Sequence, residues 1–331
     1  MKYRTLGNTG LQVSEIGLGT WQIGGASTFG GKQIGWSGMD DTTSREILKT
    51  AFDCGINFFD TADVYGRGHS EELIGAFIAD LGPARRQDLI LSSKTGNREL
   101  ESEEWIKDFS PEWIRESVEG SLKRLQTDII DVYHLHSPGP NFDYSAEIVG
   151  TLESIRKEGK IRFYGLSLIP PGRGQPPLEQ GMDVINTGRR CDFFQLVYNI
   201  LEREVEAAFL SECAQRNLGV IVRVPLQSGF LSGKYTAETR FPKDDVRSLW
   251  YTPQRIREQV AKVNRLSFLA QGGERTLAQA ALQFCLAQPA ISTVIAGARR
   301  SEQVVLNAQV SDLHRLSDTD LAKISEAIPS N

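Results

Sequence analysis

Four polar side chains occur where they could move a proton together: an acid, a phenol, an amine and an imidazole. Asp60 and Tyr65 lie in the stretch DTADVYG, Lys94 lies in SSKTG, and His136 lies in DVYHLHSP. A tyrosine, with a pKa of roughly 10, is a poor proton donor at neutral pH. A lysine ammonium within hydrogen-bond reach favours the phenolate and lowers that pKa. An aspartate would hold the lysine in place and charged, and a neutral histidine would orient a carbonyl oxygen beside the phenol.

This set is suited to protonating an oxygen on which negative charge develops, as in carbonyl reduction or, in reverse, alcohol oxidation. The hydride must come from a cofactor, because no side chain can supply one. Each of the four residues alone has an ordinary structural explanation, such as a helix cap, a rim aromatic, a solvated amine or a core imidazole. Their occurrence at the ends of three consecutive apolar segments argues against coincidence.

The segments that must position these residues are eight short apolar runs, most of them only half alternating or continuously apolar, as in strands buried on both faces. The runs span 15–21, 56–62, 88–96, 129–136, 161–168, 192–199, 219–226 and 292–297. Helical patterns lie between them, so the strands are expected to pair in parallel with right-handed crossovers. We predict one α/β domain over 1–331, a (β/α)8 TIM barrel. An open doubly wound sheet is the alternative, and it is disfavoured because no GxGxxG motif follows the first run.

Local signals mark the ends of several elements. The starting segment YRTLGNTGLQVSEI is typical of a β-hairpin, which could cap the bottom of the barrel. The tetrapeptide TSRE (43–46) has the residues of a capping box, and Gly55 would end the helix that follows. Ser110 and Pro111 predict an N-cap and a first helical position. The clearest later helices span 146–160 and 276–288.

The C-terminal ends of the strands carry the active site in barrels of this kind. The polar residues at these ends are Thr20, Trp21, Asp60, Lys94, His136, Ser167 and Asn199. The widest gap between strands holds an irregular stretch (227–253) and an extra helix (about 254–270). In a barrel this insertion would lie on the same face, so we predict long βα loops around the site.

Composition narrows the function classes. A net charge of -5 and a pI near 5.6 argue against nucleic acid as the main partner. No apolar run approaches the roughly 20 residues that span a bilayer, and the start has no signal-peptide core.

The four cysteines lie far apart without a CxxC motif, so we expect free thiols and a cytoplasmic protein. With four histidines, no His-rich metal site is expected. The oligomeric state stays open, and a monomer is compatible with the sequence.

An ordered set of motifs covers nearly the whole chain and resembles the aldo-keto reductase superfamily. The motifs are GLGTW (17–21), FFDTADVYG (58–66), SSKTG (92–96), DVYHLHSP (131–138), GLS (165–167), FFQLVYN (193–199) and VIAGARRSEQVVLNA (294–308). With GMDD before the first helix and RVPLQSGFLSGKY (223–235), the chain is similar to bacterial members that also resemble potassium-channel β subunits.

The resemblance implies a catalytic tetrad of Asp60, Tyr65, Lys94 and His136, with Tyr65 as the acid/base and NADPH lying across the barrel top. Two other polar residues fall outside the tetrad. We interpret Asp63 as a loop or cap acid. His134 lies two residues before His136 on the same strand face, so we expect a buried, hydrogen-bonded core histidine one layer deeper.

The cofactor is expected to contact residues from several strand ends. They are Gly19, Thr20, Trp21, Asp60, Ser167, Gln195, Arg223, Pro225, Leu226, Gly297, Ala298, Arg299, Arg300, Gln303 and Asn307. Arg299 and Arg300 precede a helix that starts near Ser301, where free N–H groups and positive charge suit a phosphate. The resemblance places the adenosine 2′-phosphate here, so NADP(H) is expected to be preferred over NAD(H).

Three positions depart from the family pattern. Leu168 stands where an asparagine usually binds the nicotinamide carboxamide, which leaves Ser167 and Gln195, with Asn199 as a further candidate. Arg223 replaces a stacking tyrosine, and a planar guanidinium can also stack on a ring. Leu306 replaces an acid near the adenine.

The substrate pocket is expected to have aromatic walls. Trp21 matches a pocket residue of the family, and Trp36, in the glycine-rich loop 24–41, is the second wall beside Tyr65 and His136. Trp250 and Tyr251, from the late insertion, are placed to fold over the mouth. Such walls suit small-molecule carbonyl substrates: aldehydes, ketones or sugars.

Two competing functions stay open. A lysine Schiff-base aldolase also uses a strand-end lysine on a barrel, and Lys94 could serve as one. An NADPH-sensing regulatory protein with little turnover, like the channel β subunits, would keep the same residues.

Overall fold

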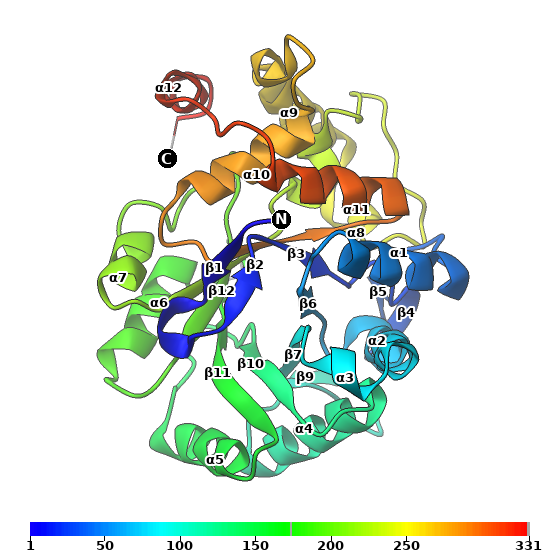
Figure 1. The fold of residues 1–331 in the computed structure, drawn as a ribbon, viewed down its shortest axis with the longest axis vertical. Helices are drawn as coiled ribbons and strands as arrows, with labels where there is room; N and C mark the ends of the chain where they lie inside the picture. The colour runs from blue at the N-terminus through cyan, green and yellow to red at the C-terminus, as the bar shows by residue number, and fades with distance from the viewer. Residues whose placement is uncertain (173, 330–331) are drawn as a thin grey trace.

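The computed structural model describes residues 1–172 and 174–329. Eight parallel strands close into a barrel in the order β10-β11-β12-β13-β14-β3-β6-β7 (Figure 1). Their bounds are β3 Ile16–Gly19, β6 Phe58–Asp60, β7 Ile90–Thr95, β10 Ile130–His136, β11 Ile161–Ser167, β12 Phe193–Val197, β13 Gly219–Arg223 and β14 Thr293–Gly297. Each predicted apolar run contains one strand, so the TIM barrel is confirmed and the open-sheet alternative is wrong.

The strand register brings the C-terminal ends together at one mouth. Asp60 pairs with Gly19 on one side and Ser92 on the other. Lys94 pairs with His134 on the next strand. Polar residues at these strand ends therefore share one face of the barrel, where the site was predicted.

The bottom of the barrel is closed by the predicted N-terminal hairpin. Strands β1 Tyr3–Thr5 and β2 Gln12–Ser14 pair antiparallel around a short 3₁₀ helix, Gly7–Thr9. Leu6 is fully buried in a cluster that includes Phe58 and Phe193 of the barrel strands. A Cβ on Gly7 would come within 2.2 Å of the backbone nitrogen of Gly219, so this close approach requires glycine.

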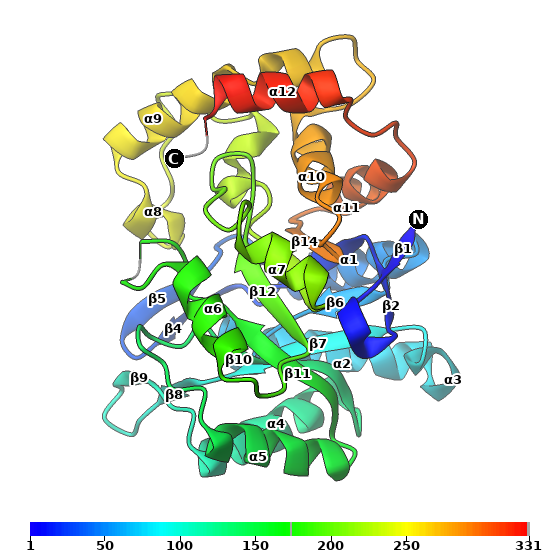
Figure 2. The ribbon, with the colours of Figure 1, turned by 90° about the vertical axis from the view of Figure 1, so that its left-hand side faces the viewer.

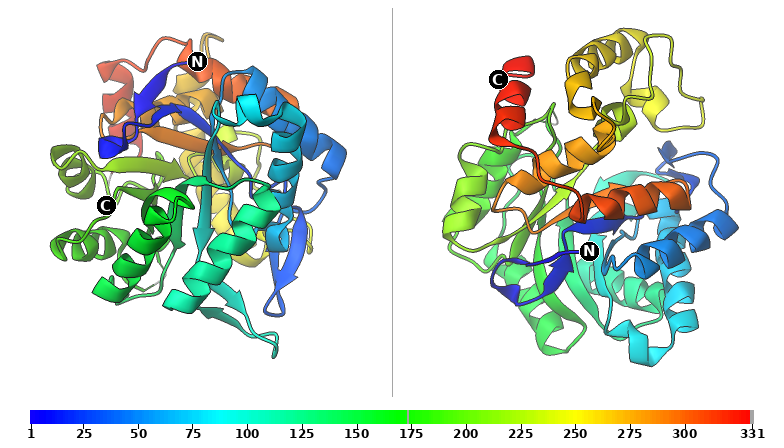
Figure 3. Two further views of the ribbon diagram at one scale, coloured as in Figure 1. Left: turned by 60° about the horizontal axis from the view of Figure 1, so that its bottom comes forward. Right: turned by 45° about the horizontal axis from the view of Figure 1, so that its top comes forward.

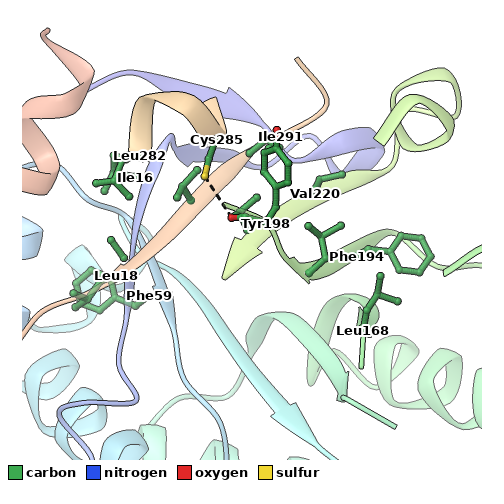
Figure 4. Packing of buried hydrophobic residues seen from close by; sticks show 14 of the residues in the cluster. Ile16, Leu18, Phe59, Leu168, Phe194, Tyr198, Val220, Leu282, Cys285 and Ile291 are labelled. Atoms are coloured by element: carbon green, nitrogen blue, oxygen red, sulfur yellow. Dashed lines mark hydrogen bonds between the residues drawn. The ribbon is translucent and has the colours of Figure 1, made fainter. Parts of the chain in front are cut away.

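Helices surround the barrel, and Figures 2 and 3 show them from further directions. They are α1 Asp41–Asp53, α2 His69–Leu81, α3 Pro83–Arg86, α4 Pro111–Leu125, α5 Ala146–Lys157, α6 Pro177–Asn186, α7 Phe209–Gln215, α10 Leu277–Ala287, α11 Ser301–Ala308, a 3₁₀ turn Gln309–Ser311, and α12 Asp318–Ala327. Figure 4 shows the apolar layer between helices and strands, where the Cys285 thiol of α10 donates to the Tyr198 carbonyl oxygen at 3.4 Å. Within the described ranges, no helix is long and apolar enough to cross a membrane.

The start of α1 differs from the prediction. Asp40, not Thr43, is the N-cap, and its carboxylate accepts hydrogen bonds from the Thr43 backbone N–H and hydroxyl, each at 2.9 Å. The expected capping box is therefore wrong, because an aspartate three residues earlier supplies a better acceptor. Gly55, with φ of 80°, follows the helix end as predicted, and Ser110 caps α4 by accepting from the Trp113 N–H.

Long loops crowd the active face, and two of them hold hairpins that the sequence did not indicate. Strands β4 Ala26–Phe29 and β5 Lys32–Gly35 lie in the loop after β3, and β8 Asn97–Glu99 and β9 Trp105–Lys107 follow β7. The late insertion contains a 3₁₀ segment Gln227–Ser232, α8 Arg247–Trp250, α9 Pro253–Asn264 and a 3₁₀ turn Ser267–Ala270. Figures 1 and 2 place α9 and α12 on the side of the molecule away from α4 and α5.

The late insertion is tied to the first of these hairpins. The Val246 N–H donates to the Gly35 carbonyl oxygen at 3.4 Å. The buried Arg247 guanidinium forms two hydrogen bonds with Asp245, at 2.8 and 2.6 Å, and lies 4.1 Å from the centre of the Trp36 ring. We call this connection, built from residues 35–36 and 245–247, the arch.

Candidate active site

A buried ion pair forms the base of the site. The Lys94 ammonium donates to Asp60 Oδ2 at 2.6 Å and to the Thr61 carbonyl oxygen. Asp60 Oδ1 accepts from Ser92 Oγ at 2.7 Å and from Gln195 Nε2 at 2.8 Å. The exposed fractions are 0% for Lys94 and 2% for Asp60. Because both carboxylate oxygens have partners and the charges neutralise each other, the pair is held rigidly in a low-dielectric setting.

Tyr65 reaches this pair because the chain turns sharply after β6. It begins a 3₁₀ segment, Tyr65–Gly68, in which Gly66 has φ of 61°. A Cβ on Gly66 would lie 2.2 Å from the Gly24 carbonyl oxygen, so only glycine fits. The Lys94 nitrogen lies 5.1 Å from the centre of the Tyr65 ring, and the His136 ring stands nearly perpendicular to it at 6.0 Å. The structure thus brings all four predicted tetrad residues together.

The pKa of Tyr65 differs from the expectation. Burial raises the pKa of this phenol above its ordinary value, and the nearby charges of Lys94 and Arg223 oppose the rise without reversing it. Lys94 lowers the pKa of Tyr65 as predicted, but desolvation of the phenolate, which the sequence did not indicate, outweighs the ammonium. Tyr65 consequently holds its proton at neutral pH, as a general acid requires.

His136 is neutral at the same pH. Burial, followed by the positive charges of Lys107, Lys94 and Arg223, keeps the pKa of its imidazole well below the usual value. Its Nδ1 lies 3.0 Å from Asn97 Nδ2 on β8. A neutral imidazole has one N–H with which to donate a hydrogen bond to a substrate oxygen. Unlike an imidazolium, it does not compete with Tyr65 as the proton donor.

The two polar residues that were placed outside the tetrad lie behind it. His134 is fully buried, and its Nε2 lies 2.8 Å from Ser92 Oγ, which confirms the predicted core histidine. Asp63 lies in the loop, as predicted, but its carboxyl is shielded and accepts from Ser117 Oγ at 3.0 Å. Burial and the charge of Glu71 raise the pKa of Asp63 to about 7.

Aromatic side chains wall the site above Tyr65. Trp21 stacks on Tyr65 with ring centres 5.9 Å apart. Trp36 meets Trp21 edge-on at 6.0 Å, and Trp250 packs against Trp21 at 5.6 Å. Trp250 thus reaches over the mouth as expected. Tyr251 instead packs against Phe230 inside the insertion, at 4.9 Å, so its expected place over the mouth is wrong.

Several residues expected to hold a nicotinamide have protein partners in this structure. Ser167 Oγ donates to Gln195 Oε1 at 3.3 Å, and the Gln195 amide donates to Asp60. Asn199 is committed elsewhere, since its amide donates to the Val224 carbonyl oxygen at 3.1 Å and to Glu202 Oε2 at 3.1 Å. Asn199 is therefore not free to replace the family asparagine.

Arg223 does not project freely from the end of β13. Its Nη2 donates to the Leu168 carbonyl oxygen at 2.8 Å and to Ser137 Oγ at 3.3 Å. The guanidinium therefore crosses from β13 towards the ends of β11 and β10, while the Leu168 side chain is buried in the apolar core.

Positive charge gathers at the other end of the barrel mouth. Arg299 lies after β14, its backbone N–H donates to Gln303 Oε1 at 2.8 Å, and its guanidinium donates to the Ser37 carbonyl oxygen at 2.6 Å. Arg300 occupies the N-cap position of α11. Lys234 joins them: burial and the charges of Arg247, Arg299 and Arg300 lower its pKa. Lys234 was not predicted as a cofactor residue, although it lies in the motif RVPLQSGFLSGKY.

The remaining predicted cofactor residues line the same mouth at strand ends. Gly19 and Gly297 end β3 and β14, which are neighbours in register, and Ala298 follows Gly297. Thr20 donates its hydroxyl to the Asp60 carbonyl oxygen at 2.8 Å. Pro225 and Leu226 follow β13, and Asn307 is buried on α11. Close by, Leu306 joins Ser232 and Gly233 in lining a hollow of about 700 Å³.

A barrel with this tetrad arrangement defines a class of oxidoreductase. The profile of the Aldo/keto reductase family matches residues 15–329, and the chain belongs to that family. Members of the family are oxidoreductases that use NAD(P)H and act on small carbonyl compounds.

Curated relatives cover the chain almost completely. "Aldo-keto reductase YhdN" of Bacillus subtilis is 33% identical over 94% of this chain and 89% of its own. A "Probable voltage-gated potassium channel subunit beta" of Oryza sativa is 31% identical over 99% and 96%. An "NADH-specific methylglyoxal reductase" of Escherichia coli is 30% identical over 98% of both chains. Among solved structures, the glycerol dehydrogenase AKR11B4 of Gluconobacter oxydans matches with a TM-score of 0.81 and 28% identity over 100% of this chain and 97% of that one.

Proposed function

We propose that this protein reduces an aldehyde, ketone or sugar carbonyl to an alcohol, reversibly, with NADPH as the preferred hydride donor. The observation that carries the proposal is the buried Lys94–Asp60 pair beneath a protonated Tyr65, with neutral His136 at its side. This arrangement places a proton donor, a buried cation and a neutral imidazole within one pocket, as protonation of a carbonyl oxygen requires.

The side chains divide the work of proton transfer. His136 donates an N–H to the carbonyl oxygen and orients it beside the Tyr65 hydroxyl. As negative charge grows on that oxygen, Tyr65 transfers its proton and the Lys94 ammonium stabilises the phenolate that remains. Asp60 keeps Lys94 charged and in place. Trp21, Trp36 and Trp250 exclude water above the phenol.

The chain also offers groups that fit a dinucleotide phosphate. Lys234, Arg299 and Arg300 bring positive charge to the start of α11, where the free N–H groups of the helix also suit an anion. When bound, the nicotinamide would supply a hydride to the carbonyl carbon. The preference for NADPH rests on this charge and not on family membership, since one relative is named NADH-specific.

The aldolase alternative is disfavoured by the partners of Lys94. A Schiff-base lysine needs a neutral, accessible amine, whereas Lys94 is fully buried and paired with a carboxylate. Borohydride trapping of Lys94 with a carbonyl substrate, without cofactor oxidation, would support the aldolase instead. The regulatory alternative draws on the relative named as a channel subunit, and tight NADPH binding with negligible turnover would support it.

A panel of carbonyl substrates, assayed side by side with NADPH and NADH, tests the proposal. Tyr65→Phe should reduce kcat by at least roughly 10²–10⁴-fold, the usual contribution of a general acid. NADPH binding, followed by quenching of tryptophan fluorescence, should persist in this variant. Near wild-type turnover by Tyr65→Phe would show that the acid is another group.

A further inference from the structure

Asn97, on the β8–β9 hairpin, is a buried polar side chain beside His136, and both its amide nitrogen and its amide oxygen have partners. Its Nδ2 lies 3.0 Å from His136 Nδ1. Its Oδ1 accepts from Trp105 Nε1 at 3.1 Å and from Lys107 Nζ at 2.8 Å. Its exposed fraction is 3%. We propose that Asn97 is a positioning residue that fixes the His136 proton on Nε2, so that this nitrogen donates to the substrate oxygen; the inference rests on the function proposed above.

The orientation of the Asn97 amide follows from its two other partners. The Trp105 indole N–H can only donate a hydrogen bond, and so can Lys107 in its ammonium form. Burial lowers the pKa of Lys107 to about 8, so near that pH the indole alone fixes the orientation of the amide. The amide oxygen must therefore face Trp105 and Lys107, and the NH₂ group must face His136. The reversed amide is excluded, because its NH₂ group would then face Trp105 and Lys107, which are themselves donors.

The tautomer of His136 follows in turn. An amide NH₂ can only donate, so Nδ1 must accept and carries no proton. A neutral imidazole then has its single proton on Nε2. Lys107 also donates to the His136 carbonyl oxygen at 2.8 Å, so the same hairpin holds both the ring and the backbone at the end of β10.

The wrong tautomer would work against the reaction. With the proton on Nδ1, the Nε2 lone pair would face the carbonyl oxygen and repel it as negative charge develops. Loss of one such donor typically lowers kcat by about 10²–10³-fold. Asn97 would thus act on catalysis through His136, without touching the substrate.

Asn97→Asp tests the inference, because a carboxylate can only accept. Trp105 and Lys107 can still donate to it, so the hairpin keeps two of its hydrogen bonds. His136 must then bear a proton on Nδ1. Two-bond ¹H–¹⁵N correlation NMR of protein labelled with ¹⁵N-histidine reads the tautomer directly, and the chain has only four histidines to assign.

We expect wild-type His136 to be protonated on Nε2 alone, and Asn97→Asp to place a proton on Nδ1. His134 is the internal control. Ser92 gives its proton to Asp60, so His134 must donate to Ser92 from Nε2, and this signal should not change. A wild-type His136 protonated on Nδ1, or an unchanged His136 tautomer in folded Asn97→Asp, would overturn the inference.

The pH profile separates positioning from damage. At pH 8, Asn97→Asp should lose about 10²–10³-fold in kcat. As the pH falls, the new carboxylate favours the imidazolium, Nε2 donates again, and the ratio of variant to wild-type kcat should rise. A ratio that stays flat with pH would contradict the role of Asn97. If the wild type itself reduces no carbonyl, the proposed function fails while the NMR result still decides the tautomer.

Discussion

Breaking the buried Asp60–Lys94 pair should destabilise the fold far more than breaking an exposed pair of the same residue types. Lys94→Met leaves a carboxylate in the barrel with only Ser92 and Gln195 as donors, and Asp60→Asn leaves an unpaired ammonium. Removing one partner of a buried pair costs about 3–5 kcal/mol in the free energy of unfolding. Lys49 and Asp53, which pair on the surface of α1 with exposed fractions of 71% and 54%, give a matched control.

The assay is urea unfolding at pH 7, followed by tryptophan fluorescence and circular dichroism. Lys49→Met should cost less than about 1 kcal/mol. The double variant Asp60→Asn/Lys94→Met removes both charges, so it should cost clearly less than the sum of the single variants. Single variants that each cost under about 1 kcal/mol, or costs that simply add, would refute the view that the pair is desolvated and mutually dependent.

Three further predictions concern the cofactor end, the loop acid and the Tyr65 turn. Arg299→Ala and Arg300→Ala should each raise KM for NADPH more than KM for NADH, and equal increases would contradict the 2′-phosphate assignment. A raised folded-state pKa of about 7 for Asp63 means that stability falls as pH rises from about 4 to 7. Asp63→Asn should therefore raise Tm relative to wild type clearly more at pH 8 than at pH 5, and an equal difference at both would refute this. Gly66→Ala should lower kcat and Tm, whereas Gly31→Ala, with a similar φ of 65° but open space around it, should lower Tm only slightly.

The barrel could be predicted because its strands are buried on both faces and therefore appear as apolar runs. The tetrad followed from the ends of those runs. The β4–β5 and β8–β9 hairpins could not be predicted, because short two-stranded ribbons over a barrel mouth leave no repeated pattern of burial in the sequence. For the same reason Asn97 was missed: an isolated polar residue past a strand end carries no signal until its partners are in place.

Electrostatic detail was the second limit. The sequence indicated a lysine beside Tyr65, but not that Trp21 would stack on the phenol while Trp36 and Trp250 pack against Trp21. Burial then outweighs the lysine in setting the pKa of Tyr65. Leu168 and Asn199 show the same limit, since one is turned into the core and the other is already hydrogen-bonded within its own loop.

The arch has a consequence for changing the substrate by loop exchange. Trp36 and Trp250 belong to segments far apart in the sequence, yet Arg247 packs on Trp36 and the Val246 N–H donates to the Gly35 carbonyl oxygen. If the loop that carries β4 and β5 were replaced alone, Arg247 would lose the Trp36 ring. If the late insertion were replaced alone, the β4–β5 hairpin would lose its contacts with Val246 and Arg247. The two loops therefore form one exchangeable unit, and a chimera that keeps a working pocket must carry both.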